Sequence, residues 1–303
     1  MQGVKRGAWT LADLKDGIVL QARSGHHRVR SDDETVACSV RGRLKQERLY
    51  TDLVATGDRV LWRPTRPGQG VIEEVLPRET KLSRLRPGPG QMPFEHVIVA
   101  NPDQAVFILS VREPEPHMRL LDRLLVLAEN NDLPAIICAN KVDLVDPGEA
   151  RAMFQPYVAI GYPVIHTSTL TGEGIDDLRE LLRGRISVLA GSSGVGKSSL
   201  LNAVQEGLGL RVKQVSDATG KGLHTTRHVE LIPLEIGGYV ADTPGIRSLA
   251  LFDLEPEELD AYYREIAPLV PDCAFSDCTH THEPGCAVRA AVDDGRVSFE
   301  RYD

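Results

Sequence analysis

A glycine-rich segment carries the clearest chemistry in the sequence. Residues 191–198 match the phosphate-binding pattern G-x4-G-K-[ST] without a mismatch, between an apolar stretch and a helical pattern. In that context the glycines let backbone N–H groups point at phosphate oxygens beside a helix N-terminus. Lys197 is expected to reach the β- and γ-phosphates of a nucleotide, and Ser198 to bind Mg²⁺. The predicted phosphate-binding residues are Gly191, Ser192, Ser193, Gly194, Val195, Gly196, Lys197, Ser198 and Ser199.

Two further segments are suited to reading a guanine base. Residues 140–143 have the pattern N-K-x-D and follow the apolar run 135–139. Asp143 can accept two N–H bonds from guanine that adenine cannot offer, which disfavours an ATPase or a kinase. Lys141 should pack along the base, and Asn140 should connect this loop to the phosphate loop. Residues 168–170 should place backbone amides near the guanine O6. The predicted base-binding residues are Asn140, Lys141, Val142, Asp143, Ser168, Thr169 and Leu170.

Downstream of the phosphate loop, two segments have the pattern of nucleotide-sensing switches. The pattern D-x-x-G occupies residues 242–245, where Asp242 should hold Mg²⁺ through water and the Gly245 amide should contact the γ-phosphate. The segment 222–226 ends in two threonines. Thr226 is the better candidate for a Mg²⁺ ligand, with Thr225 as the alternative.

One catalytic part of Ras-like GTPases is missing from the sequence. They place a glutamine directly after the D-x-x-G glycine to orient the attacking water. Here that residue is Ile246, which cannot orient water by hydrogen bonding, so slow intrinsic turnover is expected. His224 is the candidate that completes the site. The alternative is a histidine that only packs or hydrogen-bonds in its loop.

A cysteine- and histidine-rich segment near the end of the chain is suited to a metal. Cys273, Cys278, His280 and Cys286 offer three thiolates and one imidazole within 14 residues. This is a closed tetrahedral set typical of structural zinc, which would hold a segment too small for its own core. His282 is a spare donor. The competing interpretation is three unrelated free cysteines.

The elements that position these groups fall into distinct regions. Short β-rich runs over residues 11–83 predict a small OB-like barrel, and a Pro/Gly-rich stretch at 86–93 is typical of a linker. From residue 104, alternating strands and helices predict a parallel sheet with helices on both faces. Residues 255–266 read as helical. The predicted domains are an OB-fold-like RNA-binding domain at 1–85, a linker and entry strand at 86–103, an α/β P-loop GTPase domain at 104–252, and a helical zinc-binding domain at 253–303.

Composition and charge restrict the setting and the partners. The net charge is −8, but residues 1–90 carry 17 Lys and Arg against 11 Asp and Glu, which leaves −14 on the remainder. A basic front indicates an anionic partner such as RNA, or simply a solvated surface. No run of about 18 uncharged apolar residues is present, and the five cysteines do not form a disulfide framework. A cytoplasmic monomer is expected.

The order of the motifs is permuted, because the base-reading loops precede the phosphate loop and the switches follow it. With this order, the barrel in front and the metal cluster behind, the chain resembles the ribosome small subunit-dependent GTPase A family of circularly permuted GTPases. The resemblance implies a bacterial GTPase that binds ribosomal RNA, acts in late maturation of the small ribosomal subunit and is stimulated by it. A rival hypothesis is an RNA-binding assembly scaffold that uses GTP only as a structural ligand.

Overall fold

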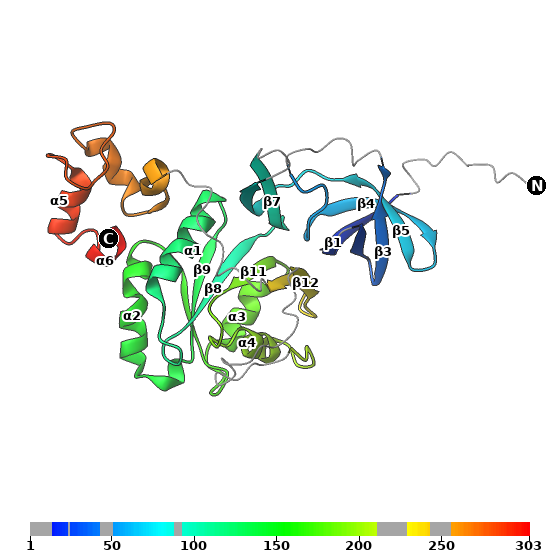
Figure 1. Ribbon diagram of the computed structural model, residues 1–303. Helices are drawn as coiled ribbons and strands as arrows, with labels where there is room; N and C mark the ends of the chain where they lie inside the picture. The colour runs from blue at the N-terminus through cyan, green and yellow to red at the C-terminus, as the bar shows by residue number, and fades with distance from the viewer. Residues whose placement is uncertain (1–13, 24, 43–50, 88–92, 211–228, 243–255) are drawn as a thin grey trace, which may run out of the picture. The chain divides into compact units, whose positions relative to one another are not determined.

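The computed structural model describes residues 14–23, 25–42, 51–87, 93–210, 229–242 and 256–303 (Figure 1). They divide into two compact units. The first lies within Met1–Asn101 and Thr226–Ile232, and the second within Pro102–Thr225 and Pro233–Asp303. The segment after the predicted switch threonine therefore belongs with the N-terminal unit, while the C-terminal cysteine-rich region belongs with the unit of the phosphate loop.

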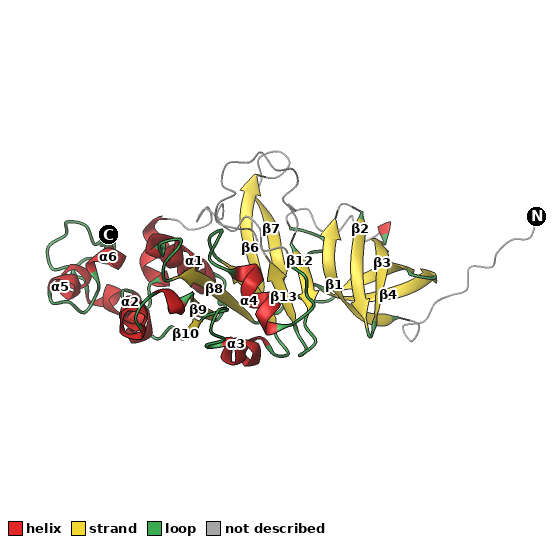
Figure 2. Cartoon of the chain, turned by 90° about the horizontal axis from the view of Figure 1, so that it is seen from below, coloured by secondary structure: helices red, strands yellow, loops and turns green. Residues whose placement is uncertain are grey.

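The first unit contains the predicted barrel. Its strands are β1 (Lys15–Arg23), β2 (His26–Ser31), β3 (Glu34–Val40), β4 (Arg59–Arg66) and β5 (Gln69–Val75). They close in the order β1-β2-β3-β5-β4, with β3 and β5 as the parallel pair. Figure 2 shows β1, β2, β3 and β4 grouped together. Apolar side chains from the alternating inner positions fill the barrel, among them Val19, Val29, Val36, Val60, Trp62 and Ile72.

The Pro/Gly-rich stretch that the sequence assigns to a linker lies between two paired strands. Strands β6 (Lys81–Pro87) and β7 (Pro93–Ala100) run antiparallel, with Lys81 opposite Ala100 and Pro87 opposite Pro93. The linker interpretation is therefore wrong for Arg86 and Pro87, which end β6, and for Pro93, which begins β7. Proline and glycine are common to hairpin connections and linkers, so composition does not separate the two.

A six-stranded sheet has the order β10-β9-β8-β11-β13-β12; its strands β8 to β11 and β13 belong to the second unit, whereas β12 begins within the first. The strands are β8 (Gln104–Ser110), β9 (Ala135–Asn140), β10 (Val164–Thr167), β11 (Ile186–Ala190), β12 (Glu230–Pro233) and β13 (Tyr239–Asp242). The neighbouring pairs from β10 to β13 are parallel. Every residue of β8, β9 and β11 is buried, as expected for a sheet covered on both faces.

Four helices cover this sheet. They are α1 (Met118–Asn130), α2 (Pro147–Ala159), α3 (Ile175–Leu182) and α4 (Lys197–Val204). Helices α3 and α4 share one apolar cluster with β8 and β11, in which Leu178, Leu182 and Leu200 are fully buried. None of the helices among the described residues combines the length and the apolar character needed to cross a bilayer.

The C-terminal region consists of short elements. They are two 3-10 segments, η6 (Pro256–Tyr262) and η7 (Ala267–Asp272), and two short helices, α5 (Ala287–Asp293) and α6 (Phe299–Tyr302). The sequence predicts one helix over 255–266, and the structure shows the 3-10 segment η6 there instead. Pro268 and Pro271 lie in η7, where each removes a backbone donor and favours a short turn over a longer α-helix.

A buried arginine connects this region to the body of the second unit. Arg301 on α6 is 7% exposed and pairs with Asp122 on α1 at 2.5 Å and with Glu265. Its guanidinium also lies beside the ring of Tyr157 on α2. A second pair joins Arg264 to Glu129 at 2.8 Å. These contacts fix the cysteine-rich region to the outer helices α1 and α2.

Candidate nucleotide site and metal centre

The predicted nucleotide loops meet at one edge of the sheet. Strands β9, β10 and β11 are parallel, so their carboxyl ends lie along the same edge. Asn140 ends β9 and pairs in register with Thr167, the last residue of β10. The phosphate loop follows β11, and Asp242 ends β13 opposite Leu189 of β11. This is the edge at which open α/β sheets bind ligands.

The phosphate loop joins β11 to α4 in the conformation that its glycines permit. Gly196 has φ +98°, and a Cβ there would lie 2.4 Å from Asn140 Nδ2, so only glycine fits. Val195 is 3% exposed and packs into the apolar cluster of β8, β11, α3 and α4, which fixes the loop against the core. Lys197 Nζ donates to the carbonyl oxygens of Gly191 at 2.8 Å and Ser192 at 3.0 Å. The ammonium group therefore lies within the loop that should surround the phosphates.

Asn140 connects the base-reading loop to the phosphate loop, as the sequence predicts. Its side chain is 1% exposed. Its Nδ2 donates to the Val195 carbonyl at 2.8 Å, and its Oδ1 accepts from the Thr167 hydroxyl at 3.0 Å. One buried amide thus holds together three loops that are distant in the sequence. The predicted base-binding and phosphate-binding loops are therefore at a fixed separation.

Asp143 is held by Ser168, for which the sequence predicts only a backbone role. The Ser168 hydroxyl donates to Asp143 Oδ1 at 2.5 Å. The Ser168 hydroxyl oxygen also accepts from the amides of Leu170 and Thr171 at 3.2 Å each. Ser168 is completely buried, and these bonds use the full capacity of its hydroxyl. The loop therefore orients the carboxylate that should read guanine.

The other residues of the predicted base and phosphate loops differ in conformation and exposure. Lys141 adopts the left-handed conformation at φ +62°, and its Nζ donates to the Glu113 carbonyl. Val142 is buried, whereas Leu170 is 81% exposed. In the phosphate loop, Ser193 is exposed. The predicted residues Thr225, Thr226, His224, Gly245 and Ile246 lie outside the described residues, and Asp242 is described for its backbone alone.

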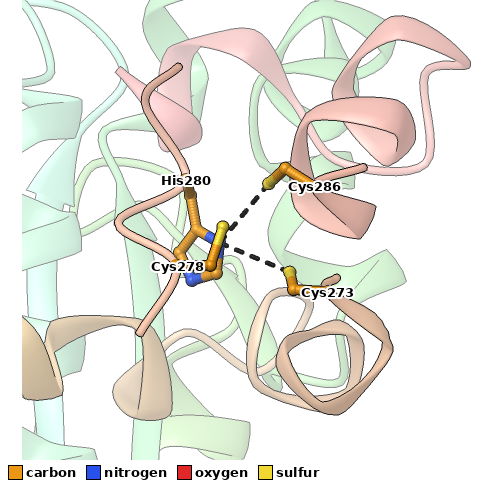
Figure 3. A group of neighbouring side chains, drawn as sticks. All are labelled: Cys273, Cys278, His280 and Cys286. Carbon is orange, nitrogen blue, oxygen red and sulfur yellow. Dashed lines mark hydrogen bonds between the residues drawn. The ribbon is translucent and has the colours of Figure 1, made fainter. Parts of the chain in front are cut away.

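The four predicted metal ligands converge (Figure 3). One ligand atom from each of Cys273, Cys278, His280 and Cys286 lies within 4.8 Å of all the others. His280 Nδ1 is 3.7 Å from Cys273 Sγ and 3.5 Å from Cys286 Sγ. Edges of about 3.5–3.8 Å are expected for a tetrahedron with metal–ligand bonds of about 2.0–2.3 Å. The cluster therefore has the donors and spacing of a closed metal site.

An aspartate that spacing does not reveal orients the imidazole. Asp260 Oδ2 lies 3.0 Å from His280 Nε2, which leaves Nδ1 to face the sulfurs. Carboxylates commonly fix metal-binding histidines in this way. His282, the spare donor, instead contacts the Thr281 hydroxyl at 2.8 Å and does not belong to the cluster.

The surroundings of the cysteines shift their pKa values in different directions, and two of the predicted ligands differ, because burial raises the pKa of Cys278 to about 11. Burial raises the pKa of Cys38 to about 11 and that of Cys138 to about 12, so both remain thiols in apolar surroundings. The pKa of Cys286 lies below its ordinary value. Burial acts to raise it, but hydrogen bonds from the Arg289 amide and from His280 lower it. The Cys286 environment thus favours the thiolate that binds metals.

Comparison with known proteins identifies the family. The RsgA GTPase model matches residues 75–252, and the RsgA N-terminal domain model matches residues 16–72. A small ribosomal subunit biogenesis GTPase RsgA from Gemmatimonas aurantiaca is 46% identical over 95% of this chain and 94% of its own length. Its counterpart from Moorella thermoacetica is 44% identical, with 95% and 94% covered.

Two crystal structures agree with these relatives. YjeQ from Thermotoga maritima has a TM-score of 0.76 at 38% identity, with 95% of each chain covered. YloQ, a circularly permuted GTPase, has a TM-score of 0.72 at 33% identity, with 98% of this chain and 94% of its own covered. The permuted motif order agrees with the description of YloQ as a circularly permuted GTPase. The protein therefore belongs to the RsgA GTPase family of GTP-hydrolysing enzymes.

Proposed function

We propose that this protein binds GTP, hydrolyses it to GDP and phosphate, and acts in late maturation of the small ribosomal subunit, which stimulates its turnover. The observation that carries the proposal is the bond from Asn140 to the Val195 carbonyl, which fixes the guanine-reading loop against the phosphate loop. Relatives at 46% and 44% identity are named for small ribosomal subunit biogenesis. The proposed setting is the cytoplasm, with the protein acting as a monomer.

The residues around the site have separate roles in this proposal. Asp143, held by Ser168, would accept the guanine N–H groups, and Lys141 would cover the base. Lys197 would neutralise charge on the β- and γ-phosphates. Ser198, Thr226 and Asp242 would hold Mg²⁺, directly or through water. When bound, the ion neutralises charge that develops on the transferred phosphoryl group.

Because slow intrinsic hydrolysis is expected of the free protein, activation by the small subunit is part of the proposed function. Ile246 occupies the position of the water-orienting glutamine, so the free protein would lack that function. We propose that docking on the small subunit brings His224 to the γ-phosphate. A positioned catalytic side chain contributes about 10²–10⁴-fold in rate.

We therefore expect bacterial small ribosomal subunits to accelerate GTP hydrolysis by the wild-type protein. His224→Ala should retain GTP binding but lose about 10²-fold or more of the stimulated rate, because water would no longer be positioned. Phosphate release with and without subunits measures the rate, and a fluorescent GTP analogue measures affinity. Unchanged turnover of the wild-type protein with subunits would favour the scaffold hypothesis. If His224→Ala keeps the stimulated rate, another group positions the water.

The metal cluster is proposed to bind one structural zinc ion. Three thiolates and one imidazole match the ligand preference of zinc, and the closed set leaves no position for substrate. Asp260 on η6 orients His280, Cys286 lies at the start of α5, and the Tyr302 hydroxyl on α6 donates to the His280 carbonyl at 2.5 Å. Zinc would thus tie together elements too short to fold alone.

Removing one ligand should release the metal. Cys278→Ser is expected to lose zinc and to loosen residues 268–303, because metal binding and local folding are coupled. His282→Ala is the matched control, since His282 lies outside the cluster, and it should keep one zinc per chain. Elemental analysis measures the metal, and limited proteolysis measures the loosening. Equal zinc content in both variants would contradict the ligand assignment.

A further inference from the structure

Side chains of the barrel contact Glu230, a residue that lies between the two predicted switch segments in the sequence. Glu230 follows the predicted switch residue Thr226 by four positions. It also begins β12, which the turn at 234–238 connects to β13 and its final residue, Asp242. Glu230 therefore lies between Thr226 and Asp242, two of the three Mg²⁺-binding candidates, along the chain.

Two barrel side chains hold the Glu230 carboxylate. Gln21 on β1 and Arg28 on β2 lie directly opposite each other in the strand register. Gln21 Nε2 donates to Glu230 Oε2 at 3.2 Å, and an Arg28 guanidinium nitrogen donates to Oε1 at 2.6 Å. Each carboxylate oxygen thus has its own donor from the barrel. These contacts lie within the first unit.

A third contact holds the backbone of the preceding residue. The Thr56 hydroxyl donates to the Val229 carbonyl at 3.2 Å and accepts from the Ala22 amide at 3.3 Å. Thr56 is 4% exposed, so this hydroxyl has little access to water. Leu231, which follows Glu230, is 1% exposed. Residues 229–231 are therefore held through the Glu230 side chain, the Val229 carbonyl and the buried Leu231.

The loop that presents Thr56 is itself fixed. Asp58 is completely buried, accepts from the Ala55 amide at 2.7 Å and pairs with Arg78 through bonds of 2.7 and 2.9 Å. Gly57 has φ +93°, and a Cβ there would lie 2.1 Å from the Ala100 carbonyl oxygen. The barrel therefore offers a rigid support for residues 229 and 230.

We infer that Gln21, Arg28 and Thr56 are positioning residues for the subunit-stimulated hydrolysis of GTP. They hold the start of β12, so that a ligand bound to the barrel acts on the switches through Glu230 and the β12–β13 connection. This inference rests on the proposed function, because the barrel ligand would be ribosomal RNA. The Arg28–Glu230 pair is half-exposed and adds little to the stability of the fold. Its role is therefore to position the start of β12.

Reversing the charge of Glu230 tests this inference. Glu230→Lys should keep the basal rate, the GTP affinity and co-sedimentation with bacterial small subunits. Its stimulation by the subunits should fall about five-fold or more, the lower range of typical coupling between sites. Glu34→Lys is the matched control, because Glu34 forms a similar exposed pair with Lys15 elsewhere on the barrel. The double variant Arg28→Glu with Glu230→Arg should recover stimulation.

A second measurement separates this inference from the proposed function. If the wild-type protein is not stimulated by subunits, the proposed function fails, and amide hydrogen exchange of the protein alone decides the inference. Glu230→Lys should then raise exchange in residues 239–242 of β13 as well as in 229–232. Exchange raised only in 229–232 would overturn the inference. If subunits do stimulate the wild-type protein, two results for Glu230→Lys would also overturn the inference. One is stimulation equal to that of the wild type, and the other is loss of co-sedimentation with the subunits.

Discussion

Lys197→Ala should reduce GTP hydrolysis about 10²–10³-fold or more, with the fold intact. The Lys197 ammonium lies against the carbonyls of Gly191 and Ser192, inside the loop that should surround the phosphates. Removing a fixed positive charge from the transferred phosphoryl group removes transition-state stabilisation directly. The loop keeps its shape without this side chain, because the Asn140 amide and the buried Val195 hold it independently. Single-turnover phosphate release measures the loss.

The control for this experiment is another lysine removed in the same way. Lys81 on β6 forms a half-exposed pair with Glu95 and lies far along the chain from the phosphate loop. Lys81→Ala should keep wild-type turnover, and both variants should melt at similar temperatures. Near-normal hydrolysis by Lys197→Ala would refute the assignment of the phosphate site. A large drop in its melting temperature would show that the side chain supports the loop instead.

The nucleotide loops could be predicted because their chemistry is local. Residues 191–198 combine the required glycines, the lysine and the serine in one segment between a strand and a helix. The ligands of the metal cluster likewise lie within 14 residues. In both cases neighbouring residues alone define the site, so spacing along the chain carries the information.

The supporting residues could not be predicted, because their partners are distant or chemically ordinary. Asp260 lies 20 residues before His280, in the 3-10 segment η6, and no spacing rule connects it with the metal ligands. Gln21 is 209 positions from Glu230, and only the barrel register reveals that it lies opposite Arg28. Such contacts follow from tertiary packing, which single-sequence patterns do not encode.

Strand β2 shows a similar limit for the fold. Its sequence, residues 26–31, contains two histidines and two arginines, so it lacks the apolar alternation by which strands are found. In the barrel, Val29 is completely buried while Arg28 is exposed, so the strand does alternate in burial. A buried histidine, His27, replaces one of the expected apolar residues. The closed barrel, not the local sequence, makes this segment a strand.

Asp143→Asn should convert the base preference from guanine to xanthine. The carboxylate is expected to accept two N–H groups of guanine, and an amide in its place would repel the exocyclic amine while donating to the keto group of xanthine. Sites that use buried polar groups in this way discriminate strongly, by about 10⁴–10⁵-fold at most. We expect GTP affinity to fall at least 10²-fold, a conservative part of that range. Competition between GTP and xanthosine triphosphate for a fluorescent analogue measures the change.

The structure supplies the control that separates base reading from loop stability. In Asp143→Asn the remaining amide oxygen can still accept from the Ser168 hydroxyl, so the loop should keep its conformation. Ser168→Ala has the opposite effect, because it keeps the carboxylate and leaves it without the bond that orients it. That variant should bind GTP more weakly without gaining affinity for xanthosine triphosphate. If both variants lose GTP and neither gains the xanthine nucleotide, Asp143 supports the loop and another group reads the base.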